Sequence, residues 1–439
     1  MPLLDGSIWD LALDDDDHLY VASGDAGLIA LSADGSEIRW RAEVGHVHRV
    51  AVAGDRIAVL VPSNASDAET SGGAGTVHVF DTSGTALGSF PGHRNTLDLA
   101  VHAATRSVIL IGWRQANASD GSATRPVQIA YLRSVAFDGT TRWTAYDWST
   151  ETDADDFLNR PENNMADTRG YRVSVGGDGR VYAAFECAGG NHIFRYDPLD
   201  ISTRVAIVGG DRYHEFFDTR SEHKTFMAIY DADTGAYQMG QQLTGRLSSG
   251  AGNTVRVRSD EITADESGRV YLAGTAASGL PLSFTPPDTG DYSGGAYLVV
   301  MSPDLAERLY VTRIDPGGAA HQVAARSIEG RTTIVLVGET SDDGAETYAS
   351  MAFQGASGGG VDGFVTVFGG EAGLLAPLDA GPRDAATPRD GGGAEPAASE
   401  AGCGCRAVGD RGARDAPYVL APFLIAWGIR RRKRVSGLR

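Results

Sequence analysis

One strand-and-turn phrase recurs along this chain of 439 residues, and the recurrence restricts the fold more than any other feature of the sequence. Its clearest copy runs from Asp260 to Arg313. There, four short runs of β-forming residues, EITAD, RVYLAGT, AYLVVMS and RLYVTR, alternate with turn-forming segments. Each run suits a short strand and is too short for a core helix. We therefore expect a repeat protein built from four-stranded meanders.

Six such units can be aligned on their second strands, which read HLYVASG, RIAVLVP, SVILIGW, RVYAAFE, RVYLAGT and TTIVLVGE. Pairs such as Asp178-Gly179 and Ser267-Gly268 supply the positive φ that tight hairpins need. A single four-stranded sheet cannot bury both of its faces, so the units must stack, and radial closure also protects their edges. The predicted fold is an all-β propeller over residues 1–368 with six visible four-stranded blades, or seven if strands precede Met1.

The connection between the second and third strands is long in five units, whereas the opposite hairpins are short. These connections are residues 62–75, 114–126, 188–224, 276–294 and 339–361. In a meander blade this connection always opens on the same face of the disc. Loops on a rigid β scaffold are the usual place for binding, so we expect ligand contact on this face.

Polar side chains gather at the start of the innermost strands of the fourth and fifth units. Alignment of the Gly-Arg-Val-Tyr phrases places Asn164 over Asn253 and Arg169 over Arg258. Such a group can bind a sugar or a carboxylate, perform acid–base chemistry, or only hydrogen-bond neighbouring blades. The candidate binding residues, which include three at the loop end of the adjacent strand, are Asn164, Arg169, Glu186, Asn191, His192, Asn253 and Arg258.

Three other motifs lack the spacing or the flanking structure that a metal site or a catalytic site requires. Asp14 to Asp17 lacks the spacing of a calcium loop, and His46 and His48 share a face of a strand without a carboxylate fixed by spacing. The Gly-x-Ser-x-Gly run at residues 355–359 lies between loops rather than between a strand and a helix. We assign no catalytic residue, metal site or cofactor, and we expect Cys187 to be a buried apolar residue.

The formal net charge of −19 disfavours nucleic acid as a partner, because an acidic body repels phosphates. With three cysteines in the whole chain, no disulfide framework is expected.

The end of the chain changes character. Residues 369–402 are rich in Gly, Ala and Pro and are expected to form a disordered tether. A Cys motif with Cys403 and Cys405 follows, then an apolar run at 416–429 and the basic cluster 430–434. This order predicts a short hydrophobic helix whose basic end marks the cytoplasmic side of a membrane. We therefore divide the chain into a propeller (1–368), a tether (369–402) and an anchor segment (403–439).

Three resemblances add expectations. Residues 268–275 with 295–301, and 334–340 with 362–368, resemble the SBBP family of bacterial β-propeller repeats. The Asp-Gly…Trp phrases ending at Trp40 and Trp143 resemble quinoprotein-type propeller repeats. The tail resembles the myxobacterial C-terminal sorting signal (MYXO-CTERM type). That resemblance implies a transient inner-membrane anchor, a sorting protease acting near Cys403, and delivery to the cell surface, the outer membrane or the medium.

Such a tail requires the secretory route, yet no signal peptide opens the sequence, so we expect further residues before Met1.

For function, the favoured interpretation is a binding module for a glycan or protein ligand. The alternative is an extracellular polymer-degrading hydrolase or lyase with its site at the channel mouth. A quinone-dependent dehydrogenase is a third and more distant interpretation.

Overall fold

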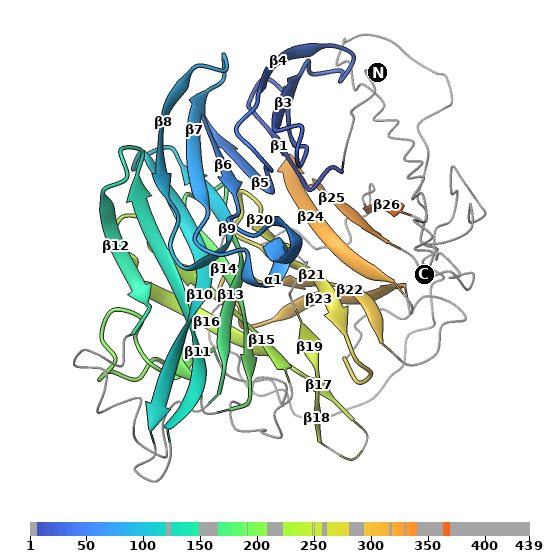
Figure 1. The fold of residues 1–439 in the computed structure, drawn as a ribbon. Helices are drawn as coiled ribbons and strands as arrows, with labels where there is room; N and C mark the ends of the chain where they lie inside the picture. Colours follow the sequence, from blue (N-terminus) through green and yellow to red (C-terminus); the bar gives the residue numbers. More distant parts are fainter. Residues whose placement is uncertain are drawn as a thin grey trace, which may run out of the picture.

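A computed structural model of the protein describes residues 7–119, 124–148, 166–190, 192–208, 223–247, 249, 251–256, 261–280, 294–315, 318–328, 331–339 and 363–368. Within this part, six consecutive antiparallel sheets form the blades of a propeller, which confirms the predicted fold (Figure 1). The predicted tether, the short hydrophobic helix and the cysteines Cys403 and Cys405 lie outside the described residues. The proposed division of the chain into three segments therefore stays a prediction.

The first three blades are four-stranded meanders. Blade 1 contains β1 (Asp10–Leu13), β2 (Leu19–Ala22), β3 (Leu28–Leu31) and β4 (Ile38–Ala42). Blade 2 contains β5 (Arg49–Ala53), β6 (Arg56–Val61), β7 (Thr76–Asp81) and β8 (Ala86–Pro91). Blade 3 contains β9 (Asn95–His102), β10 (Ser107–Ser119), β11 (Thr124–Ala136) and β12 (Thr141–Tyr146).

Blade 4 repeats this pattern, and blades 5 and 6 vary it. Blade 4 contains β13 (Thr168–Val175), β14 (Val181–Ala188), β15 (His223–Tyr230) and β16 (Tyr237–Leu243). Blade 5 contains β20 (Ile262–Ala264), β21 (Val270–Ala276), β22 (Gly295–Met301) and β23 (Arg308–Asp315), with β19 (Val255–Arg256) also paired to β21. Blade 6 shows three strands within the described residues: β24 (Ala319–Ile328), β25 (Arg331–Glu339) and β26 (Gly363–Phe368). A small hairpin of β17 (Gly245–Arg246) and β18 (Gly252–Asn253) lies between blades 4 and 5 in the chain.

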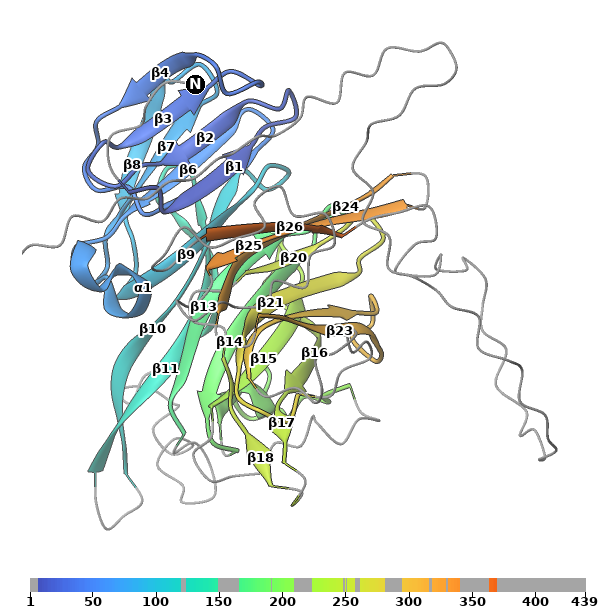
Figure 2. The same ribbon diagram turned by 90° about the vertical axis from the view of Figure 1, so that its right-hand side faces the viewer.

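Helix is confined, in the described part, to three single turns. These are η1 (Ala65–Asp67), α1 (Ala68–Ser71) and η2 (Ile193–Arg195). Figure 1 shows α1 near the middle of the ring of blades, and Figure 2 shows blade 1 beside blade 6. The short helix α1 belongs to the 62–75 connection, which is one of the five long loops expected on a single face.

The segment 114–126 differs from the expected open loop. The strands β10 and β11 remain paired out to Ser119 and Thr124 and form a long ribbon. The cause is that Ala116 and Val127 are buried in the core between blades. Buried apolar residues therefore continue both strands into the segment that its turn-forming residues had marked as a loop.

Aromatic side chains of one blade pack on turn glycines of the next. A Cβ atom built on Gly84 would lie 2.8 Å from Trp40, and one built on Gly235 would lie 2.6 Å from Trp143. The two glycines have φ of 91° and 74°, which most side chains avoid. Each indole N–H also donates to a carbonyl of the same turn, at 3.2 and 3.0 Å respectively. These contacts give the Asp-Gly…Trp phrases a physical role, because they join consecutive blades at the outer strand.

Candidate functional site

Every blade places a polar side chain at the same register position in its first strand or, for Glu261, directly before it, and an apolar residue follows each time. The six first strands lie next to one another around the axis, each in contact with that of the next blade. We call this set the axial ring, and its members are, in chain order, Asp10, Arg49, Asp98, Arg172, Glu261 and Gln322. The ring therefore alternates acid and base up to its last member, which is an amide.

The acidic members of the ring tie neighbouring blades together. A carboxylate oxygen of Asp10 accepts a hydrogen bond from the backbone N–H of Val50 in the next blade, at 2.9 Å. Asp98 accepts the corresponding bond from the backbone of Val173, also at 2.9 Å. The same contact thus recurs at two junctions, and it satisfies a backbone donor at the centre of the propeller.

The surroundings of the ring disfavour negative charge, although Asp10 and Glu261 are half-buried rather than fully buried. Desolvation raises the pKa of Asp10 to about 6, against the opposing attraction of Arg49. Desolvation likewise raises the pKa of Asp98. Burial and the nearby carboxylates of Asp98 and Asp10 raise the pKa of Glu261 well above its ordinary range. The axial ring therefore contains three acidic side chains and only two arginines.

The helix α1 is held over the channel by the carboxylate of Glu69. Arg49 donates through Nη2 to both oxygens of this carboxylate, at 3.0 and 2.9 Å, and Arg172 donates to Oε2 at 2.9 Å. Both arginine side chains are nearly fully buried and come from blades 2 and 4, on either side of blade 3. Burial opposes ionisation of Glu69, but the two guanidinium groups prevail and hold the pKa of Glu69 far below its ordinary range. We call this arrangement the Glu69 clasp.

Aromatic side chains complete the neighbourhood of the clasp. The imidazole Nε2 of the fully buried His48 lies 3.0 Å from Glu69 Oε1, and burial lowers the pKa of His48 to about 4. The indole ring of Trp9 packs against His48 and His46, with centroid distances of 4.9 and 5.7 Å. Since His48 is neutral near pH 7, the charge of Glu69 is balanced by the arginines rather than by the imidazole.

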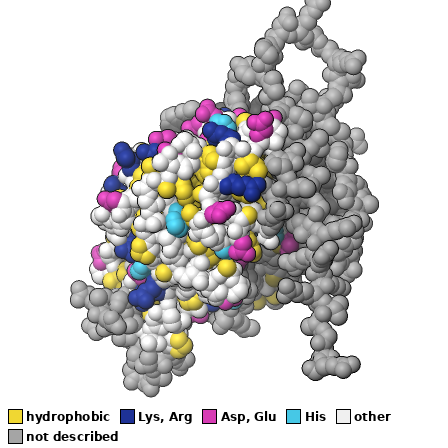
Figure 3. Space-filling view, turned by 45° about the horizontal axis from the view of Figure 1, so that its top comes forward, with side chains coloured by type: hydrophobic (Ala, Val, Ile, Leu, Met, Phe, Trp, Pro, Cys, Tyr) yellow, Lys and Arg dark blue, Asp and Glu magenta, His cyan; other side chains and the backbone are white. Residues whose placement is uncertain are grey.

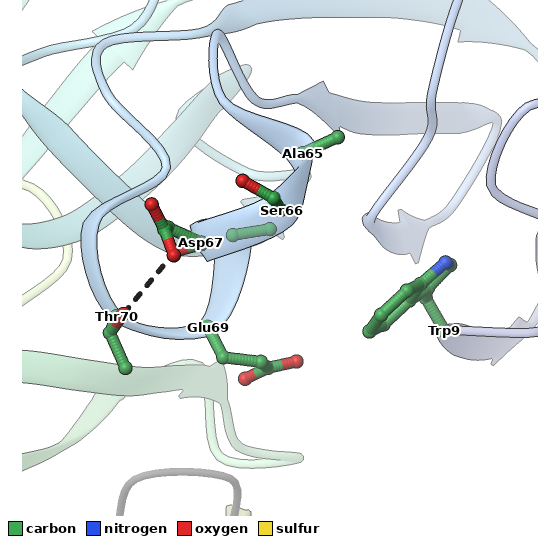
Figure 4. A pocket seen from close by; sticks show the side chains of 7 residues that line it. Trp9, Ala65, Ser66, Asp67, Glu69 and Thr70 are labelled. Atoms are coloured by element: carbon green, nitrogen blue, oxygen red, sulfur yellow. Dashed lines mark hydrogen bonds between the residues drawn. The ribbon is translucent and has the colours of Figure 1, made fainter. Parts of the chain in front are cut away.

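A small pocket of about 170 Å³ opens between Trp9 and α1 (Figure 4). Figure 4 shows the indole ring across the pocket from the helix, its nitrogen on the far side, and the carboxylate of Glu69 directed towards the ring. The pocket is lined by Trp9, Ala65, Ser66, Asp67, Ala68, Glu69 and Thr70. It thus joins an apolar aromatic wall to a wall rich in hydrogen-bond acceptors and hydroxyl groups.

A second pocket, of about 250 Å³, lies on the opposite face. It is lined by Asp55, Arg56, Ala103, Arg106 and Phe137, which belong to the short hairpins. Its charged side chains Asp55 and Arg56 pair with each other rather than with the channel. We therefore treat it as a control for the pocket beside α1.

Of the predicted binding residues, the structure brings Arg169 and Glu186 together. Their side chains lie 3.3 Å apart, and Nδ1 of His223 lies 2.7 Å from the same Glu186 oxygen. The guanidinium of Arg169 also lies over the ring of Trp113, at 5.8 Å, and the indole N–H of Trp113 donates to the carbonyl of Thr70 in α1. A continuous set of contacts therefore links this pair to the channel mouth.

Two further predicted residues lie elsewhere. His192 is fully buried against Phe194 and Phe226, with Nε2 3.3 Å from Gln242, and burial lowers its pKa to about 3. Asn253 lies in the β17–β18 hairpin, where its amide donates to Ser278. Their surroundings give both side chains structural partners. The remaining candidates, Asn164, Asn191 and Arg258, lie outside the described residues.

The sequence did contain a signal for the site that was missed. Alignment on the first strands, rather than on the second, gives the phrases DLAL, RVAV, DLAV, RVSV, EITA and QVAA, each of which opens on the axial ring. Glu69 and Trp9 left no such pattern, because each occurs in one unit only. The expected burial of Cys187 is confirmed, since its side chain is fully buried.

Within the described residues there is no group of three or more His, Cys, Asp or Glu side chains placed to hold a metal ion. A search of the same residues finds no helix with the length and hydropathy to span a membrane. In the view of Figure 3, the described surface mixes acidic and basic side chains with hydrophobic ones.

Comparison with known proteins finds distant similarity in structure and none in sequence. No protein-family model matches the chain, and no curated protein matches it significantly in sequence. Similar solved structures include hydrazine synthase of Kuenenia stuttgartiensis, with 9% identity and a TM-score of 0.43 over 77% of this chain and 80% of that one. BamB from Moraxella catarrhalis has 13% identity and a TM-score of 0.35 over 76% and 74% of the two chains. A chain of the mitotic checkpoint complex has 10% identity and a TM-score of 0.38 over 76% and 75%.

Proposed function

We propose that this propeller is a binding module whose ligand docks at the channel mouth, beside α1. The observation that carries this proposal is the Glu69 clasp. Two nearly buried arginines from different blades converge on one carboxylate, and that carboxylate belongs to a loop. A core does not need a loop residue to neutralise its arginines when ring acids such as Asp98 lie nearby. The clasp instead fixes a short helix, and with it a pocket, on a rigid scaffold.

Rigidity favours binding on physical grounds. A loop that is already ordered in the free protein loses less conformational entropy when a ligand docks on it. The 62–75 connection is ordered by the clasp, by the indole hydrogen bond from Trp113 to Thr70, and by the backbone bond from Asn64 to Gly72. The face on which it lies is the one where the long connections were expected to open.

The test is an unbiased binding screen of the full chain against a glycan array and a display library of peptides. Trp9→Ala removes the aromatic wall of the pocket, and Phe137→Ala removes an aromatic side chain beside the opposite pocket. We expect ligand capture to fall at least tenfold in Trp9→Ala and to persist in Phe137→Ala. Capture that depends on Phe137 but not on Trp9 contradicts the proposal.

A polymer-degrading hydrolase or lyase is the second candidate, favoured by the Glu186–His223 pair. A nearly buried carboxylate 2.7 Å from an imidazole is an arrangement that can relay a proton. The check is an assay of the full chain on a panel of extracellular polysaccharides. Turnover that is lost in both Glu186→Gln and His223→Ala, with folding preserved, supports an enzyme over a simple binding module.

For location we propose display at the cell surface or release into the medium, following transient anchoring in the inner membrane. The support is the order of tether, Cys motif, apolar run and basic cluster in residues 369–439. We also propose that the last two blades are repeats of the SBBP family. Expression of the natural gene with Cys403→Ser and Cys405→Ser is expected to retain the protein in the inner membrane. An unprocessed cytosolic protein in the wild type contradicts this location.

A further inference from the structure

We infer that the pocket between Trp9 and α1 binds a single neutral pyranose ring, as a free sugar or as one unit of a glycan. This inference rests on the proposed binding function and deepens it, because it names the chemical class of the ligand. It depends on three properties of the pocket: its walls, its charge and its size.

The two walls match the two sides of a pyranose. One wall is the ring of Trp9, which offers a flat apolar surface to the C–H face of a sugar. The other is the turn of residues 65–70, which contributes the carboxylates of Asp67 and Glu69 and the hydroxyls of Ser66 and Thr70 to the lining. Both oxygens of Glu69 are already bonded to Arg49, Arg172 and His48, so sugar hydroxyls would donate to the Asp67 carboxylate and to the oxygens of Ser66 and Thr70. An amphipathic ring therefore fits better than a purely apolar group.

The charge balance selects a neutral ligand. Asp67 and Glu69 line the pocket and no basic residue does, so an acidic sugar would meet carboxylates. A cation would meet a carboxylate whose charge is already offset by Arg49 and Arg172, at 2.9 Å each. Neutral hydroxyl donors avoid both penalties, since they need acceptor lone pairs rather than net charge.

The size of the pocket limits the ligand to one ring. Its volume is about 170 Å³. Drug-sized ligands occupy pockets of roughly 300–1,000 Å³. A longer glycan would therefore place one residue in the pocket and extend over the surrounding face.

The test uses the full chain and saturation-transfer NMR with methyl glycosides of glucose, galactose, mannose and N-acetylglucosamine, together with methyl glucuronide and tetramethylammonium. We expect at least one neutral glycoside to bind with a dissociation constant of about 1–10 mM, as befits a dozen or so heavy atoms. Trp9→Phe should keep the affinity within threefold and Trp9→Ala should lower it at least tenfold. Ser66→Leu, at an exposed position, should abolish binding by filling the pocket without disturbing the core, and Phe137→Ala should leave it unchanged.

Failure of this inference and failure of the proposed function give different results. If only tetramethylammonium or the glucuronide binds in a Trp9-dependent way, the pocket is a binding site but its ligand is not a neutral sugar. If no glycoside binds while a screened peptide is captured through Trp9, the inference is overturned and the binding module stands. Glycosides that bind Trp9→Ala and Ser66→Leu as well as wild type overturn the assignment to this pocket.

Discussion

Gln322 in β24 donates a hydrogen bond of 2.7 Å to the carboxylate of Asp10 in β1, across a sequence separation of 312 residues. This contact joins the last blade to the first. Propeller blades contact only their neighbours, so the junction between the first and last blades is the one that the order of the sequence does not enforce. Figure 2 shows the two blades side by side at this junction. A polar side chain of the axial ring thus contributes to closing the propeller.

Gln322→Ala is expected to lower the free energy of unfolding by about 1–2 kcal/mol, because it removes a hydrogen bond to an ionisable group. Gln238→Ala, at an exposed position of β16, is the matched control and should change stability by less than about 0.5 kcal/mol. Urea denaturation of the full chain measures both. Equal effects of the two substitutions would show that the Gln322 contact has no part in closure.

Asp10→Asn is expected to flatten the dependence of stability on pH. The pKa of Asp10 in the folded protein is about 6, above its ordinary value of 3.8, so the folded state binds this proton more tightly than the unfolded state. The resulting stabilisation is complete below about pH 4 and is lost as the pH rises through 6, an effect of about 2–3 kcal/mol.

The measurement is the free energy of unfolding at half-unit steps from pH 4 to 7.5. Asp98 and Glu261 contribute losses of the same sign, whereas His48 and His192, whose pKa values burial lowers, contribute gains as the pH rises. The prediction therefore concerns the difference between the two curves: relative to wild type, Asp10→Asn should become more stable as the pH rises from 4 to 7.5, by about 2–3 kcal/mol. Asp55→Asn, which changes an exposed carboxylate, should follow the wild-type curve. A curve for Asp10→Asn parallel to wild type contradicts the assignment.

Glu69→Gln is expected to loosen the channel mouth by leaving Arg49 and Arg172 without their shared carboxylate. Because the Glu69 side chain is 34% exposed, water relieves part of the cost, and we expect a loss of about 2 kcal/mol rather than the full penalty of a buried pair. Glu37→Gln, at an exposed turn, is the control.

A double-mutant cycle of Glu69→Gln with Arg172→Met isolates the interaction. The account predicts a coupling energy of about 1 kcal/mol or more and faster amide exchange in residues 65–71. Additive effects of the two substitutions, with unchanged exchange, indicate that the clasp does not order α1.

Gly84→Ala tests the packing of aromatic side chains on turn glycines. The new methyl group would lie 2.8 Å from Trp40, at a position whose φ is 91°. Gly54→Ala is a matched control, since Gly54 also has a positive φ, of 57°, but its nearest neighbour would be 3.7 Å away. The thermal unfolding midpoint should fall further in Gly84→Ala, by the equivalent of about 1–3 kcal/mol. Equal losses would attribute the whole effect to backbone conformation.

Features of the fold that depend on local geometry could be predicted from the sequence. The alternation of apolar residues and the Gly-containing turns fixed the blades, and in blade 5 all four expected strands form where EITAD, RVYLAGT, AYLVVMS and RLYVTR stand. Periodic patterns arise from local geometry, so they are readable without coordinates. The Arg169–Glu186 pair was also within reach, because facing residues on adjacent strands follow from register.

The Glu69 clasp could not be predicted from the sequence. The clasp joins three different elements, because Arg49 lies in β5, Glu69 in α1 and Arg172 in β13. Glu69 and Arg172 are 103 residues apart in the sequence. Their meeting depends on how a single loop folds over the channel. His48 illustrates the same limit: its spacing from His46 indicated only a shared face, whereas its closeness to Trp9 and Glu69 depends on blade packing.

The most direct measurement is a reversible block of the channel mouth. In a chain with Cys403→Ser and Cys405→Ser, the exposed Ser66→Cys is joined by a disulfide to a bulky thiol reagent, while Cys187 is fully buried. Asp55→Cys, at the opposite pocket, is modified in the same way. The account predicts that modification at position 66 abolishes ligand capture, that reduction restores it, and that modification at position 55 has no effect. Full capture with position 66 blocked, or loss with position 55 blocked, would contradict a ligand site at the channel mouth.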